Sequence, residues 1–213
     1  MNPFRFRLIN HAISLFIAVF MILATSTPAL ASSVRQVSLN EMTTVCEFIF
    51  EGRVIGHRVR SNTEEGAIRT AVTFEVLDII KGDPVEGTLE LQFLGGTSGG
   101  RTLKVTDMHL PKIGEKGIYF VESLDRQYVN PLCAWDQGHF VIERELQNDT
   151  EIIKTRTRQM IYGIDTNRSI QARGLNRGVA SGVRLIPQTT AEKPLDVEDF
   201  KQHLRILLVE SQE

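Results

Sequence analysis

Hydrophobic and polar residues alternate with a period of two along much of the chain, and this pattern predicts β-strands. The clearest example is Ala67–Lys81, where Val72 and Phe74 share one face while polar residues alternate with them. Its Val72–Lys81 part and Thr88–Leu94 flank a Gly-Asp-Pro turn, so these two segments are predicted to form a hairpin.

The same alternation marks four further predicted strands: Cys46–Arg60, Thr102–Val105, Gly117–Leu124 and His139–Arg144. The longest of them contains Gly52 and Gly56, which predict a β-bulge or a sharp bend. Short strands at even spacing, separated by Gly and Pro, are typical of antiparallel barrels. The predicted fold class is therefore mainly β, with a small five-stranded antiparallel OB-like barrel as the best fit.

The pattern changes to a helical period at both ends of the chain. Ser38 is predicted to cap a short N-terminal helix, with Glu41 completing a capping box. Asp196 is predicted to cap a C-terminal helix whose apolar face carries Phe200 and Leu204. We therefore divide the chain into a signal at 1–31, a barrel domain at 32–145 and a C-terminal extension at 146–213. This extension contains an ambiguous segment at 151–162, read as a strand, and a glycine-containing linker at 167–181.

The first 31 residues have the pattern of an export signal. Arg5 and Arg7 precede an apolar run, and the small residues Ala29-Leu30-Ala31 predict cleavage before Ser32. The apolar run is shorter than the roughly 20 residues that span a bilayer, which favours a cleaved signal over a membrane anchor. No later segment is a predicted membrane span. The predicted location is therefore the periplasm or the outside of the cell.

The net charge of the chain argues against nucleic acid as a partner. The chain of 213 residues has 24 basic and 26 acidic residues, and cleavage would remove two arginines and no acid. The mature chain would carry a net charge of −4, with 22 basic against 26 acidic residues. Nucleic-acid binding is not predicted, because it needs a basic surface.

Cys46 and Cys133 are the two cysteines of the chain. In an oxidising compartment such a pair is predicted to form one structural disulfide. The alternative is a catalytic thiol at Cys133 with His139 as its base. The histidines show no spacing typical of a metal site, so no metal or cofactor is predicted.

A glycine-rich segment is the candidate binding loop, and it consists of Gly95, Gly96, Thr97, Ser98, Gly99, Gly100 and Arg101. It nearly matches a phosphate-binding loop, but such a loop needs a helix after it, and Thr102–Val105 is predicted to be extended. We interpret it as a loop between strands, where glycine lets a partner approach the backbone closely. Trp135, close to Cys133 in the sequence, is a further candidate binding residue. The alternative is that its ring packs on the disulfide.

Two segments resemble a known family. Cys46–Gly56 (CEFIFEGRVIG) and Val72–Gly82 (VTFEVLDIIKG) are similar to the first two strands of netrin-like domains, the barrel family of tissue inhibitors of metalloproteinases. Leu39–Leu124 resembles still more closely a group of exported bacterial proteins without assigned activity. The resemblance implies an OB-like barrel. Those inhibitors chelate the protease zinc through a first-residue cysteine, whereas Ser32 is the predicted first residue here, so that mechanism is not carried over.

The leading functional hypothesis is an exported, non-enzymatic module that binds another periplasmic or extracellular protein, with a protease among the candidate partners. One alternative is a periplasmic hydrolase that uses Cys133 or His139. The other alternative is a structural component of the cell envelope.

Overall fold

The computed structural model describes residues 35–61, 67–145, 149–165 and 178–211. The predicted signal at 1–31 and most of the predicted linker lie outside these ranges. Within them the chain is mainly β with one short N-terminal and one C-terminal α-helix, as the sequence predicted. Neither of these helices combines the length and the apolarity that crossing a bilayer would require.

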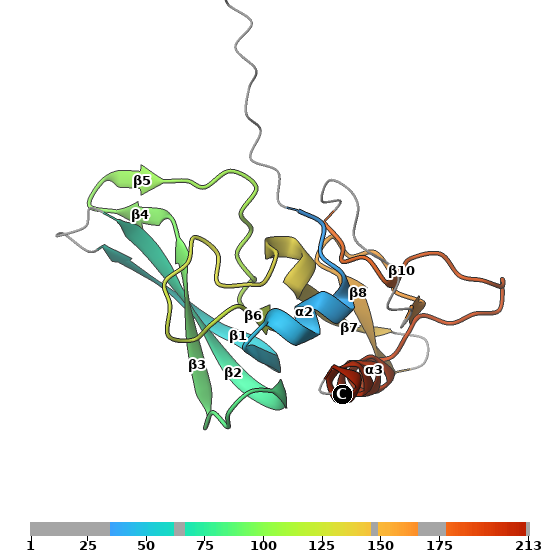
Figure 1. Ribbon diagram of the computed structural model, residues 1–213. Helices are drawn as coiled ribbons and strands as arrows, with labels where there is room; N and C mark the ends of the chain where they lie inside the picture. The colour runs from blue at the N-terminus through green and yellow to red at the C-terminus, as the bar shows by residue number, and fades with distance from the viewer. Residues whose placement is uncertain (1–34, 62–66, 146–148, 166–177, 212–213) are drawn as a thin grey trace, which may run out of the picture. The chain divides into compact units, whose positions relative to one another are not determined.

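An antiparallel sheet of six strands forms the centre of this unit, in the order β3-β2-β1-β6-β7-β8 (Figure 1). Its strands are β1 (Phe48–Ser61), β2 (Ile68–Lys81), β3 (Thr88–Leu94), β6 (Lys116–Val121), β7 (His139–Glu145) and β8 (Thr150–Thr155). Two small pairs are separate from it, β4 (Gly96–Ser98) with β5 (Arg101–Leu103) and β9 (Gly163–Ile164) with β10 (Val183–Arg184). The predicted hairpin is confirmed, because β2 pairs with β3.

The prediction of five strands is wrong, and closure into a barrel is not shown. The sixth strand, β8, comes from the segment that the sequence assigned to the C-terminal extension, and it pairs with β7 along its length. The two edge strands, β3 and β8, do not pair with each other. Each edge instead has another partner: Ile153 of β8 donates its amide to the Leu195 carbonyl, and Leu94 of β3 donates to the Val129 carbonyl.

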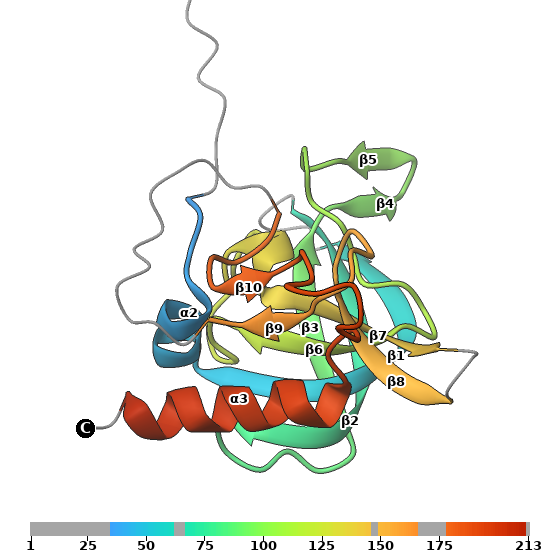
Figure 2. The same ribbon diagram turned by 90° about the vertical axis from the view of Figure 1, so that its right-hand side faces the viewer.

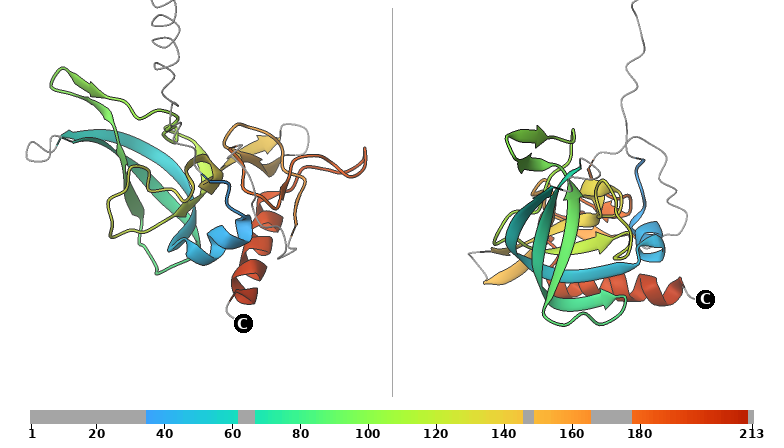
Figure 3. Two further views of the ribbon diagram at one scale, coloured as in Figure 1. Left: turned by 45° about the horizontal axis from the view of Figure 1, so that its top comes forward. Right: turned by 90° about the vertical axis from the view of Figure 1, so that its left-hand side faces the viewer.

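β1 pairs with β2 on one side and with β6 on the other. Its register against β2 shifts between Glu51 and Gly52 and again between Val54 and Gly56. These are the positions where glycine predicted a bulge, and Figure 3 shows the bend of the long β1–β2 ribbon. The bend lets one strand contribute to two differently oriented parts of the sheet.

Each face of the sheet carries its own apolar cluster. Side chains of β6 alternate between them, so Phe120 belongs to one cluster and Tyr119 to the other. The Phe120 cluster packs against α2 (Leu39–Val45) and α3 (Val197–Glu210), which Figure 2 shows near one another. The Tyr119 cluster is rich in aromatic side chains from β1, β2 and β3.

Both helices begin where the sequence predicted. The Ser38 hydroxyl accepts a hydrogen bond from the Glu41 amide at 3.0 Å, and the Asp196 carboxylate accepts one from the Asp199 amide at 2.8 Å. On α3, Phe200 and Leu204 are fully buried. Residues 146–213 therefore supply a strand and a helix to the same core as residues 35–145.

Candidate functional site

The two cysteines form a disulfide bond, which confirms the sequence prediction. Cys46 is the C-cap residue of α2, and Cys133 donates its amide to the Phe120 carbonyl of β6 at 2.8 Å. The bond therefore joins the end of α2 to the segment that leaves the sheet after β6. It also removes the thiol that a catalytic role of Cys133 would need.

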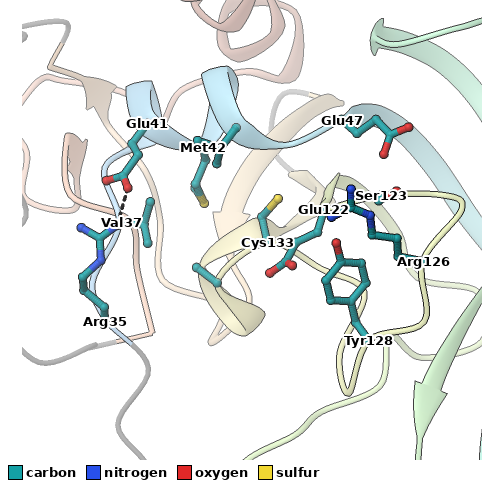
Figure 4. A pocket seen from close by; sticks show the side chains of 12 residues that line it. Arg35, Val37, Glu41, Met42, Glu47, Glu122, Ser123, Arg126, Tyr128 and Cys133 are labelled. Carbon is teal, nitrogen blue, oxygen red and sulfur yellow. Dashed lines mark hydrogen bonds and ion pairs between the residues drawn. The ribbon is translucent and has the colours of Figure 1, made fainter.

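A groove of about 580 Å³ opens above this disulfide, between α2 and the segment 122–128 (Figure 4). Its floor is formed by Val37, Met42, Val45, Cys133 and Ala134, of which Met42 and Cys133 are buried and Val45 is exposed. Charged and polar side chains surround this floor: Arg35, Glu41, Glu47, Glu122, Ser123, Arg126 and Tyr128. Apolar residues bordered by charged and polar ones occur at binding surfaces.

Contacts at both ends of α2 fix the helix beside the groove. Arg35 forms an ion pair with Glu41 at the start of the helix. At its end the Lys81 ammonium donates to the carbonyls of Thr43, Thr44 and Cys46, at 2.8, 2.9 and 2.6 Å. A cation is favourable there, because the last carbonyls of a helix lack partners within the helix.

The opposite wall is attached to the β3 edge of the sheet. The Tyr128 carbonyl accepts a hydrogen bond from Arg69 Nη1 at 2.7 Å, and the neighbouring Val129 carbonyl accepts one from the Leu94 amide at 2.9 Å. These hydrogen bonds to backbone carbonyls hold the segment that carries Arg126 and Tyr128. Contacts with helices and strands therefore hold both walls of the groove in place.

Glu47 and Glu122 stand opposite each other where β1 and β6 meet. The Glu47 amide donates to the Glu122 carbonyl at 3.3 Å, and Phe48 pairs in register with Val121. Phe48 and Val121 belong to the aromatic cluster, whereas both glutamates line the groove, where Figure 4 shows their side chains pointing away from each other. Among the described residues neither carboxylate has an ion-pair partner within 4.0 Å. Burial raises the pKa of the Glu122 carboxyl.

The predicted binding loop is a β-hairpin in the structure. β4 and β5 pair through Thr97 and Thr102, and the turn between them is Gly99-Gly100. Strands flank this turn on both sides, so it is not a phosphate-binding loop, which needs a helix. Gly95 connects the hairpin to β3, and its carbonyl accepts a hydrogen bond from the Thr70 hydroxyl at 2.8 Å.

Trp135 lies elsewhere, at the start of the 3₁₀ turn η1 (Trp135–Gly138). Figures 1 and 2 place this turn near α2 and the β4–β5 hairpin in a separate region of the fold. The structure therefore does not bring Trp135 and residues 95–101 together into one site. Trp135 is half-buried with φ +61°, and its neighbour Ala134 lines the groove floor.

His139 is inside the fold and does not reach the groove. Its Nε2 lies 2.8 Å from Glu115 Oε1, and its ring packs against Tyr119 with centroids 5.0 Å apart. The side chain is only 2% exposed, and Arg158 covers Glu115 through an ion pair at 2.9 Å. A base enclosed in this way has no access to a substrate.

Among residues 35–61, 67–145, 149–165 and 178–211, no group of three His, Cys, Asp or Glu side chains could hold a metal ion. Comparisons with family models, curated proteins and solved structures found no match to this chain. Sequence reasoning missed Glu47, Glu122, Arg126 and Tyr128, since only the pairing of β1 with β6 and the course of 122–128 bring them together.

Proposed function

We propose that this chain is an exported, non-enzymatic module that binds a segment of another periplasmic or extracellular protein in the groove beside α2. The apolar floor around the disulfide, bordered by charged side chains, carries this proposal. Val45 supports it most directly, because this large apolar side chain lines the groove and is 64% exposed. Grooves that bind ligands place apolar side chains beside a few polar groups, and Val45 is the exposed apolar side chain of this groove.

The hydrolase alternative has less support. Cys133 is bonded to Cys46, and His139 is enclosed by Glu115 and the Tyr119 ring. The two residues on which that alternative depends therefore lack the free thiol and the access that catalysis would need.

The likeness to netrin-like domains is a further part of this proposal. Two observations support it: Cys46 lies two residues before a long, bent first strand, and that strand pairs with strands on both sides. On this interpretation the sheet is an opened relative of an OB-like barrel, and a protease is one candidate partner. An experimental structure with the partner bound would test both points.

Site-specific photo-crosslinking in the producing cell tests the binding function. A photoreactive amino acid is placed at Val45 in the groove, at Thr97 in the β4–β5 hairpin, or at Ile186. Ile186 is the matched control, because it is 76% exposed and lies outside the groove. We expect a discrete crosslinked product at Val45 and none at Ile186, with the partner identified by mass spectrometry.

The outcomes separate the alternatives. A product at Thr97 but not at Val45 would assign binding to the predicted glycine-rich loop and would overturn the groove as the site. Absence of any product at Val45 and Thr97, with the protein still exported and folded, would overturn the binding function. A structural component of the envelope would then be the better hypothesis.

A further inference from the structure

The two edges of the main sheet differ in how their outward-facing backbone amides are paired. At the β8 edge, the amide of Ile153 donates to the Leu195 carbonyl at 3.1 Å, and the amide of Thr155 donates to the Gln159 carbonyl at 2.9 Å. The chain that follows β8 therefore occupies this edge. The β3 edge is covered less completely.

The register of β3 on β2 shows which of its amides face outward. The Gly95 amide donates to the Ile68 carbonyl, and the Val76 amide donates to the Gly87 carbonyl. Both bonds continue the β2–β3 register, in which hydrogen-bonded pairs recur at every second residue. The odd-numbered residues of β3 therefore pair with β2, and the backbone groups of its even-numbered residues face away from the sheet.

Two of these outward amides have no partner among the described residues. The amides of Thr88 and Leu94, at the two ends of β3, donate to loop carbonyls at 3.0 and 2.9 Å. Between them, the amides of Glu90 and Gln92 form no such bond. β3 thus offers two neighbouring positions at which a further strand could pair.

A slot of about 220 Å³ lies along this part of β3. Glu90, Leu91 and Gln92 line one side of it, and residues 123–127 with Pro131 line the other. Figure 1 draws β3 at the edge of the sheet, with the loop between β6 and η1 next to it. Adjacent strands lie only about 4.8 Å apart, so one extended chain can enter a slot of this kind.

We propose that β3 accepts an extended segment of a partner protein as an additional strand in this slot. The main chain of the segment pairs with the outward backbone groups of Glu90 and Gln92. In this mode of recognition the main-chain hydrogen bonds supply the affinity. The inference goes beyond the proposed function, because it concerns a second surface and does not depend on what binds in the groove beside α2.

β3 lacks the features that commonly block an edge strand. Its register with β2 contains no shift, and its seven residues include no proline. The charged side chain of Glu90 lies 3.0 Å from Arg60 of β1, two strands into the sheet. This side chain therefore extends back over the sheet and leaves the edge open.

A single segment fits the slot better than a second copy of this chain does. A second copy would bring a strand with its own sheet attached, and residues 123–127 bound the slot on the side where that sheet would lie. The slot also indicates the composition of the segment. Leu124 is an apolar lining residue that is 39% exposed, whereas Glu90 and Gln92 are polar. Because side chains alternate along a strand, we expect a segment of alternating apolar and polar residues.

N-methylation of a peptide tests strand addition, since it removes one main-chain donor and leaves every side chain in place. The probe is Lys-Thr-Val-Thr-Val-Thr-Lys, blocked at both ends, with a series of analogues that each carry one N-methyl group. Amide chemical shifts of the ¹⁵N-labelled chain from Ser32 onward report the site and the affinity. We expect the unmodified peptide to shift the amides of Glu90 and Gln92.

The analogues should divide into two sets, because only every second amide of a strand faces its neighbour. N-methyl groups at alternate residues should weaken binding about tenfold, equivalent to about 1.4 kcal/mol. N-methyl groups at the residues between them should weaken it much less. This alternation does not depend on the direction or the register in which the peptide binds.

Matched substitutions at Glu90 separate main-chain recognition from side-chain recognition. Glu90→Pro removes the outward amide, and an edge strand tolerates proline at such a position. Glu90→Thr keeps the amide and removes the carboxylate. We expect the folded Pro variant to lose the shift at Gln92 and the Thr variant to bind the peptide with unchanged affinity. If Glu90→Pro does not fold, the N-methyl series decides.

Equal effects of N-methylation at all residues would overturn the inference. Absence of shifts at Glu90 and Gln92 with the peptide in millimolar excess would overturn it too. Shifts of these amides that depend on protein concentration without any peptide would assign the edge to a second copy and would also overturn it. Photo-crosslinking at Val45 reports on the groove alone, so capture there without peptide binding at β3 removes this inference and leaves the proposed function standing. The converse result supports strand addition at β3 and overturns the groove as the site.

Discussion

Lys201 of α3 and Glu51 of β1 form an ion pair inside the protein, with Nζ 2.8 Å from Oε2 and each side chain only 6% exposed. Asp78 and Glu198 also accept from this ammonium, at 3.1 and 2.6 Å. Burial alone would lower the pKa of Lys201, but the three carboxylates outweigh it and raise that pKa. This charged contact holds the C-terminal helix against the sheet.

Lys201→Met is expected to lower the free energy of unfolding by about 3 kcal/mol, because the Glu51 carboxylate would stay buried with fewer partners. Lys116 still lies 3.0 Å from Glu51, which limits the loss. Urea unfolding monitored by circular dichroism would measure it.

Glu198→Gln provides the control, because Glu198 is 76% exposed and its pair with Lys201 should contribute less than about 1 kcal/mol. The double variant Glu51→Gln/Lys201→Met should recover part of the stability. A loss below about 0.5 kcal/mol in Lys201→Met would contradict an important role for this pair.

The disulfide is expected to contribute about 4 to 5 kcal/mol to stability in the chain-entropy model, because it closes a loop with a sequence separation of 87. The variant Cys46→Ala/Cys133→Ala should therefore unfold at a much lower urea concentration. Reduction of the unmodified chain should shift its midpoint to the same value, whereas the variant should not respond to reductant. A midpoint that reductant does not change would contradict this role.

Local features of the fold could be predicted from the sequence, because they depend on neighbouring residues. The caps at Ser38 and Asp196 and the β2–β3 hairpin are confirmed. The glycine positions of the β1 bulges are confirmed too, because glycine permits the local change of backbone conformation.

Features that depend on pairing between distant strands could not be predicted. The sequence predicts the β8 segment as part of a C-terminal extension, because its pairing with β7 depends on a strand that is distant from its own residues. Glu47 and Glu122 are far apart in the sequence, and only the pairing of β1 with β6 brings their backbones together. The sequence does not predict the groove for the same reason.

Lys81→Met is expected to destabilise the chain by about 1 to 2 kcal/mol, because three carbonyls at the end of α2 would lose a charged donor. Methionine keeps most of the apolar stem and removes only the ammonium. Hydrogen exchange of the α2 amides should quicken more than that of the β6–β7 amides. Lys112→Met, at an exposed position, should change neither the stability nor the hydrogen exchange of the α2 amides.

Acid is expected to weaken the fold through Glu115. Burial alone would raise the pKa of its carboxyl, but the hydrogen bond with His139 and the charges of His139 and Arg158 hold it below its ordinary value of 4.5. A carboxyl whose pKa is lowered on folding stabilises the folded state above its unfolded pKa, and this contribution is lost as the pH falls through the folded value.

The free energy of unfolding should therefore decrease as the pH is lowered from about 6 to about 3, and Glu115→Gln should flatten this dependence. Glu86→Gln, an exposed substitution, should keep the slope of the unmodified chain. Chemical unfolding at a series of pH values measures both. An unchanged slope in Glu115→Gln would contradict this assignment.

Gly99 and Gly100 have φ values of +56° and +74°, and Ser98 pairs with Arg101 across them. A two-residue turn with both φ angles positive is type I′, which admits Gly and Asn but strains β-branched residues. Gly99→Asn should therefore keep the β4–β5 hairpin, whereas Gly99→Val should open it. Amide hydrogen exchange at Thr97 and Thr102 would show the difference. The free energy of unfolding should change by less than about 1 kcal/mol, since the β4–β5 pair lies outside the main sheet. Equal protection in both variants would contradict the assigned turn.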